Sequence, residues 1–191
     1  GPEKKSHKVT PKEKRLTAFH EAGHAVCTYY CDHQDKVHQV SIIPRGMAGG
    51  YTMSLPEQDK SFVSKKEMEE NIITLLGGRV AEQLVLDDIS TGASNDLERA
   101  TSTARSMVTR YGFSEKLGPI VYGNDQNEVF LGRDLGSSRD YSDRVAGEID
   151  DEVRNIVEKA YDKATAILQM HMDQLELLAK YLMTHEKIEK D

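Results

Sequence analysis

His20, Glu21 and His24 have the residue types and the spacing of a zinc site, in the sequence HEAGH. On an α-helix, four residues turn the chain by about 400°, so the two imidazoles leave the same face about one turn apart. Both rings can then bind one zinc ion, and Glu21 can accept a proton from a zinc-bound water. A catalytic zinc normally has a third protein ligand and an open position for water. The motif therefore predicts a zinc hydrolase whose third ligand lies elsewhere in the chain.

The residues around the motif are small or apolar, namely Ala22, Gly23, Ala25 and Val26. The alternative interpretation is a surface helix that carries two solvated histidines. Such neighbours instead indicate a closely packed segment, and buried histidines need hydrogen-bond or metal partners. We therefore favour metal binding.

Two acidic residues are candidates for the third ligand. Glu82 lies on a predicted downstream helix, as the glutamate ligand of thermolysin-like enzymes does. Asp96 lies at the start of another predicted helix, where its alternative role is to stabilise the positive helix end. The metzincin arrangement is excluded, because Cys27 and Tyr30 occupy the positions of its glycine and third histidine. Spacing alone does not choose between Glu82 and Asp96.

The motif must lie in the middle of a helix to work in this way. Thr10 can cap such a helix, Pro11 suits its first position, and Glu13 completes a capping box. The predicted helix continues to about Tyr30, so HEAGH falls near its centre.

Two further helices are predicted downstream. The first begins with a capping box at residues 64–67, and it contains a Gly77-Gly78 pair that costs about 1 kcal/mol per glycine relative to alanine. Close approach of a neighbouring helix would justify that cost. The second helix is predicted to be capped by Ser94 or Asn95 and to end near Gly112.

Two short strands are predicted between the first two helices, at residues 40–43 and 51–55. Glycines in the connecting loop would let another backbone approach closely. We predict that this region pairs with an extended peptide substrate, through Met47, Gly49, Gly50 and Tyr51. An ordinary hairpin turn is the alternative.

Helical periodicity returns at residues 141–168 and 172–183, which predicts a C-terminal helical hairpin. The expected fold is therefore mainly α, a multihelical domain with a small β-sheet near residues 37–56 and that hairpin. At 191 residues the chain is long enough for one domain with its own core.

The composition disfavours several classes of protein. The net charge is −7, and no cluster of lysine and arginine stands out, so no nucleic acid partner is expected. The sequence has no run of 18 apolar residues, so we expect no membrane-spanning segment in it. Cys27 and Cys31 are expected to be core residues in a reducing compartment rather than a disulfide.

Five ordered segments resemble the peptidase domain of the FtsH family of membrane-anchored, ATP-dependent zinc metalloproteases. They are FHEAGHAV, IIPRG, LLGGRVAE, STGASNDLERAT and RYGFSEKLGP, and the resemblance extends over nearly the whole chain. It implies that His20, His24 and Asp96 bind one zinc ion per chain and that Glu21 is the catalytic base. It leaves Glu82 as a residue that orients a ligand histidine.

The resemblance also implies parts that this chain lacks. Family members carry membrane-spanning helices and an AAA ATPase module, and no G-x-x-x-x-G-K-[ST] motif is present here, so ATP is expected to bind only in that module. Members form homo-hexamers that degrade unfolded polypeptides in protein quality control. The full-length protein is expected to be anchored in the cell membrane with this domain on the cytoplasmic side, and the domain alone is expected to be soluble.

The expected organisation follows from these assignments. Residues 1–9 are predicted to be a tag remnant and linker, since Gly1-Pro2 is typical of a cleaved purification tag. Residues 10–136 are predicted to form the catalytic zinc-peptidase core, and residues 137–191 a C-terminal helical segment of the same domain.

Two other functions share some of these features. A stand-alone zinc aminopeptidase would also contain HEAGH, but it would act as a monomer on short peptides. A non-catalytic helical assembly module would bury His20 and His24 in its core and would bind no metal.

Overall fold

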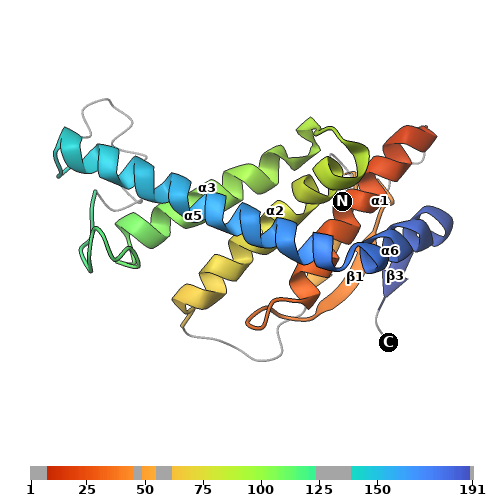
Figure 1. The fold of residues 1–191 in the computed structure, drawn as a ribbon, viewed down its shortest axis with the longest axis horizontal. Helices are drawn as coiled ribbons and strands as arrows, with labels where there is room; N and C mark the ends of the chain where they lie inside the picture. The colour runs from red at the N-terminus through yellow and green to blue at the C-terminus, as the bar shows by residue number, and fades with distance from the viewer. Residues whose placement is uncertain (1–7, 45–48, 55–61, 124–138, 190–191) are drawn as a thin grey trace.

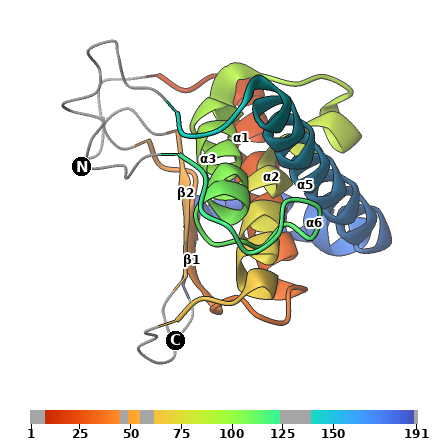
Figure 2. The same cartoon turned by 90° about the vertical axis from the view of Figure 1, so that its left-hand side faces the viewer.

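The computed structural model describes residues 8–44, 49–54, 62–123 and 139–189. Within these ranges the chain is mainly helical and has one small antiparallel sheet, which confirms the predicted fold class (Figure 1). The strands lie on one side of the helices (Figure 2). None of the helices in these ranges is long and apolar enough to cross a membrane.

Helix α1 (Pro11–Tyr29) carries the HEAGH motif near its middle, as predicted. Thr10 is extended and its side chain accepts a hydrogen bond of 3.1 Å from the backbone N–H of Glu13. The segment from Ala18 to Thr28 is buried except at His24, because other elements pack around it. The motif therefore belongs to the most enclosed helix segment of the described chain.

Helix α2 (Lys65–Leu86) packs along α1. Its start is the predicted one, since the side chain of Ser64 accepts from the N–H of Glu67 at 3.1 Å. The two helices come close at a pair of glycines. A Cβ atom on Gly77 would lie 2.7 Å from the carbonyl oxygen of Gly23 and 3.0 Å from Sγ of Cys27. The predicted reason for a glycine in this helix, close approach of a neighbour, is confirmed at Gly77.

Helix α3 (Ser94–Thr109) follows directly from a short 3₁₀ helix, η1 (Thr91–Ala93). The predicted cap, Ser94 or Asn95, is wrong: Ala93 occupies the capping position and makes no side-chain cap hydrogen bond. The reason is that η1 merges with α3, so the N–H of Ser94 already bonds to the carbonyl of Thr91. The capping side chain lies one turn earlier, where Ser90 Oγ accepts from the N–H of Gly92 at 3.1 Å.

Helices α5 (Asp143–Met170) and α6 (Met172–His185) confirm the two C-terminal helices. The predicted hairpin, in which the two helices would pack against each other, is not observed. Helix α5 packs on α2 and α3, whereas α6 packs on α1, and the two make few contacts with each other. Only His171 joins them, and α6 leads away from the end of α5 (Figure 1).

The sheet has the order β2-β1-β3, with strands β1 (Val37–Ser41), β2 (Tyr51–Ser54) and β3 (Lys187–Glu189). Both pairings are antiparallel. The first predicted strand is displaced, since it occupies residues 37–41 rather than 40–43. Strand β3 was not predicted, because its three residues are too few to establish an alternating pattern.

The hydrophobic core lies where the helices meet. Its largest fully buried apolar side chains come from α2, α3, α5 and α6, and they include Ile72, Leu76, Met107, Ile149, Leu168, Leu175 and Leu182. One charged side chain is enclosed with them: Glu82 is 0% exposed. A buried carboxylate needs strong partners, which makes its surroundings the first place to look for a functional site.

Candidate metal centre and active site

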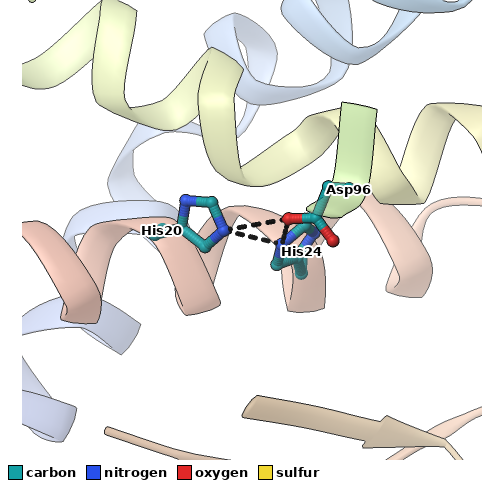
Figure 3. A group of neighbouring side chains, drawn as sticks. All are labelled: His20, His24 and Asp96. Atoms are coloured by element: carbon teal, nitrogen blue, oxygen red, sulfur yellow. Dashed lines mark hydrogen bonds and ion pairs between the residues drawn. The ribbon is translucent and has the colours of Figure 1, made fainter. Parts of the chain in front are cut away.

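Helices α1 and α3 bring His20, His24 and Asp96 together (Figure 3). Oδ2 of Asp96 lies 3.2 Å from Nε2 of His20 and 3.1 Å from Nε2 of His24. The two Nε2 atoms are 3.0 Å apart. In the described part of the chain, no other group of three His, Cys, Asp or Glu side chains converges in this way.

The outer nitrogen of each ring has a partner that fixes its tautomer. His20 Nδ1 donates to Glu82 Oε2 at 2.6 Å, and His24 Nδ1 donates to the carbonyl oxygen of Thr74 at 2.7 Å. In the neutral rings both Nε2 atoms therefore carry lone pairs, which face each other and a carboxylate oxygen. Three lone pairs converging on one point repel one another unless a cation lies between them.

The spacing of these atoms suits a metal ion. In a tetrahedral zinc site with ligand bonds of about 2.0–2.1 Å, the ligand atoms lie about 3.3 Å apart. The three distances here are 3.0, 3.1 and 3.2 Å. Shifts of a few tenths of an ångström would therefore admit the ion. Two imidazole nitrogens and a carboxylate are also donors that zinc commonly takes.

Glu82 supports His20 from α2 rather than facing the point of convergence. Its other oxygen, Oε1, accepts from both the N–H of Ser90 at 3.0 Å and the Ser90 hydroxyl at 2.6 Å. Beside it, a Cβ atom on Gly78 would lie 2.5 Å from His20 Nε2, so this glycine leaves room for the ring. The structure thus separates the two acidic candidates: Asp96 lies at the convergence, and Glu82 lies behind His20.

Carboxylates around His20 favour its protonated form. Burial alone would lower the pKa of His20, but hydrogen bonds with Asp96 and Glu82 and the charge of Glu21 outweigh burial and raise this pKa from 6.5 to about 10. Burial would raise the pKa of Asp96, yet hydrogen bonds with the two histidines lower it. The pKa of Glu82 is also lowered, by hydrogen bonds from His20 and Ser90 that outweigh burial. The centre therefore attracts positive charge, which a proton or a metal ion can supply.

Glu21 lies beside the centre on α1 and is 7% exposed. Its carboxylate oxygen Oε1 accepts a hydrogen bond of 2.8 Å from the hydroxyl of Thr52 in β2. Sequence reasoning did not single out Thr52, Thr74 or Ser90. No local pattern marks them, because the fold brings each from another segment to the side chain that it contacts.

A cavity of about 810 Å³ opens onto the centre. Glu21, the two histidines and Asp96 line it, and β2 forms another wall. Three predicted substrate-strand residues, Gly49, Gly50 and Tyr51, are in that wall, whereas Met47 lies outside the described residues. The volume lies within the range of cavities that hold a small ligand or a few residues of a peptide.

Comparison with known proteins gives the relatives of this chain. Residues 7–191 match the model of Peptidase family M41. The chain is 57% identical to an ATP-dependent zinc metalloprotease FtsH of Caldicellulosiruptor bescii and 57% identical to one of a Thermoanaerobacter species, in each case over 98% of this chain. An FtsH protein of Alkaliphilus metalliredigens is 56% identical over 100% of it.

The chain corresponds to only part of each of these relatives. The chain spans only 30%, 31% and 28% of these three proteins. The family model, by contrast, extends over nearly all of this chain and includes every residue of the centre described above. This protein therefore belongs to peptidase family M41.

Proposed function

We propose that this chain is the zinc endopeptidase domain of a longer, ATP-dependent membrane protease. The observation that carries the proposal is the convergence of His20 Nε2, His24 Nε2 and the Asp96 carboxylate beside a cavity that also contains Glu21. The names of the FtsH relatives support zinc as the metal. One zinc ion per chain is expected.

His20, His24 and Asp96 would hold the ion, with Glu82 fixing the ring of His20 through Nδ1. Bound zinc supplies a Lewis acid that activates water and the scissile carbonyl. Glu21 acts as the general base, accepting a proton from the attacking water at its carboxylate. It then passes that proton to the nitrogen of the leaving amine.

The substrate is an unfolded polypeptide bound in an extended form. Strand β2 lies at the edge of the described sheet and beside the cavity, so its outer backbone groups are placed to pair with an added strand. We assign this role to Gly49, Gly50 and Tyr51, and we extend it to Met47 on the sequence alone. Pairing through the backbone requires no particular side chains in the substrate, which suits a protease of unfolded chains.

The longer protein would supply what this chain lacks. We propose an AAA ATPase module that delivers the substrate, membrane-spanning helices that anchor the protein with this domain on the cytoplasmic side, and assembly as a homo-hexamer. Within this chain, residues 10–136 would form the catalytic core and residues 137–191 a helical segment of the same domain, with residues 1–9 as tag remnant and linker. Light scattering on the longer protein tests the hexamer.

Metal analysis tests the centre directly. We expect about one zinc per chain natively, little in Asp96→Ala, and an intermediate amount in Glu82→Ala. Glu98→Ala is the matched control, since Glu98 is an exposed residue of α3, the helix that carries Asp96, and does not line the cavity. If Glu82→Ala lost more zinc than Asp96→Ala, the ligand assignment would be reversed, and a native protein without zinc would favour the assembly module.

Peptide hydrolysis tests the chemistry. Glu21→Gln is expected to keep its zinc and to lose cleavage of an amino-terminally acetylated peptide, because it keeps the shape of the side chain but cannot accept the proton. An aminopeptidase would not cleave that blocked peptide, so its hydrolysis by the native chain separates the two enzymes. Retained cleavage in Glu21→Gln would remove Glu21 from the mechanism.

A further inference from the structure

Strand β2 and Gly50, the residue directly before it, lie against Glu21. The hydroxyl of Thr52 donates to Glu21 Oε1 at 2.8 Å and also lies 3.2 Å from the backbone carbonyl oxygen of Glu21. A Cβ atom on Gly50 would lie 3.2 Å from Cγ of Glu21. Residues 50 and 52 face the same side of an extended strand, because side chains alternate with a period of two. The hydroxyl of Thr52 and the backbone at Gly50 thus lie on the side of this segment that faces Glu21.

A glutamate side chain has three rotatable torsions, so contact with Cγ alone does not orient its carboxylate. The hydrogen bond from Thr52 holds one oxygen, Oε1, in a fixed direction. The other oxygen, Oε2, has no hydrogen-bond partner among the described residues, and Glu21 lines the cavity. One oxygen is therefore held while the other stays available for proton transfer.

The position of Thr52 is itself fixed by the sheet. Its backbone is paired with Val40 of β1, and Val40 is 3% exposed and is also paired with Ile188 of β3. The hydroxyl of Thr52 is consequently carried by a strand whose inner edge is anchored. The outer edge of that strand is the one to which we assign substrate pairing.

We infer that Thr52 is a positioning residue, which orients the carboxylate of Glu21 for proton transfer and does so from the strand that binds the substrate. This inference rests on the proposed role of Glu21 as general base. It assigns a function to the hydroxyl of Thr52, separate from the backbone contacts of the same residue.

The first test compares two substitutions that differ in the hydroxyl. Thr52→Val keeps the branched shape and strand backbone but removes the donor, whereas Thr52→Ser keeps the donor. For Thr52→Val we expect kcat to fall by about 10- to 100-fold, with KM and zinc content within about twofold of native. Thr52→Ser is expected to recover most of the loss. The control is Thr165→Val, which removes a hydroxyl bonded to a helix carbonyl of α5, away from the cavity.

The outcomes separate this inference from the proposed function. Three outcomes would overturn the role of Thr52 and leave the proposed peptidase intact. They are a native kcat in Thr52→Val, a loss of kcat in Thr52→Ser equal to that in Thr52→Val, and a loss of activity that comes from KM or from zinc content. A zinc-loaded native protein that cleaves no better than Glu21→Gln would overturn the proposed function, and this inference with it.

A second readout needs no metal and no activity. In metal-free protein, the melting temperatures of Thr52→Val, Glu21→Ala and the double variant form a double-mutant cycle. Because the two side chains are bonded, the double variant is expected to lose less than the sum of the two single losses. Strict additivity would mean that Thr52 does not hold Glu21, and the inference would fail.

Discussion

At the scale of single residues, the centre depends on partners that point away from the metal position. Glu82 and the carbonyl of Thr74 each accept from the Nδ1 atom of one histidine, so each Nε2 is left facing inward. Such partners also keep the rings from rotating. The cost of enclosing Glu82 is offset by three hydrogen bonds, from His20 and from the N–H and hydroxyl of Ser90.

Zinc binding should depend on pH through His20. The ring must lose the proton that its carboxylate neighbours stabilise, and its pKa is raised to about 10. Apparent zinc affinity is therefore expected to increase about tenfold per pH unit between about pH 7 and 9, since one proton is displaced. Competition titration with a chromogenic chelator measures this slope. Glu82→Gln removes one of the negative charges beside His20. In this variant the zinc affinity is therefore expected to stop rising at a lower pH.

The metal-free protein should show the opposite trend in stability. A pKa raised in the folded state above the ordinary value of 6.5 means that protonation of His20 stabilises the fold. That contribution is fully present below about pH 6.5 and is lost as the pH rises toward 10. The pKa values of Asp96 and Glu82 are lowered, so these carboxylates affect the stability only at acid pH, where their protonation removes the contribution. They therefore do not change the trend between pH 6 and 10. Melting temperatures of the chelated protein across pH 6 to 10 test the sign, and a rise would contradict it.

At the scale of elements, glycines decide how closely the helices approach. Gly23 and Gly77 are where α1 and α2 come close, and Gly78 faces the ring of His20. By contrast, a Cβ atom on Gly147 in α5 would meet nothing within 4 Å. The same residue type is therefore required in one helix and replaceable in another.

Gly77→Ala and Gly147→Ala should change stability in opposite directions. In Gly77→Ala the new methyl group would overlap the backbone of α1, which costs about 1–3 kcal/mol and exceeds the gain in helix propensity. In Gly147→Ala only that gain of about 0.5–1 kcal/mol remains. Urea unfolding of the metal-free proteins measures both. Equal effects would mean that α1 and α2 are not in contact at this glycine.

Gly78→Ala should weaken metal binding while the helix remains. Its Cβ atom would lie 2.5 Å from Nε2 of His20, so the ring could not keep its position in the centre. We expect a marked loss of zinc per chain and an unchanged helical signal in circular dichroism, with Gly147→Ala as the control. Full zinc content in Gly78→Ala would mean that the ring can be displaced without loss of the site.

Sequence patterns predicted the elements that have local signals. Thr10 and Ser64 mark helix starts that the structure confirms, because a capping side chain bonds within its own turn. The start of α3 was predicted one or two residues late, because η1 precedes it and carries the capping side chain. Strand β3 and the separation of α5 from α6 depend on contacts between segments far apart in the chain, and no local pattern encodes them.

The same distinction applies to the centre. His20, Glu21 and His24 share one helix, so their spacing alone indicated zinc chemistry. Asp96 and Glu82 come from different helices, and spacing left both open as ligands until the resemblance to the FtsH family favoured Asp96. Their different positions relative to His20 become visible only when α2 and α3 are placed on α1.

At the scale of the whole molecule, a bound ion would join α1 to α3, two helices that are separated in the sequence by β1, β2 and α2. A ligand that binds only the folded state stabilises it by mass action. Chelation is therefore expected to lower the melting temperature, and zinc in excess to restore it. Asp96→Ala should remove this response, whereas Glu98→Ala should retain it. A zinc response in Asp96→Ala equal to the native one would place the ion elsewhere.

The two edges of the small sheet differ in a way that limits how far it can grow. One edge is β3, only three residues long, with an ion pair of 3.1 Å between Lys187 and Glu189. Short, charged edges resist pairing with foreign strands. The other edge, β2, opens beside the cavity. Under the proposed function, an extended substrate would be added at β2. A sheet that continued from molecule to molecule would also have to pass through β3, so the described sheet is not a ready template for aggregation.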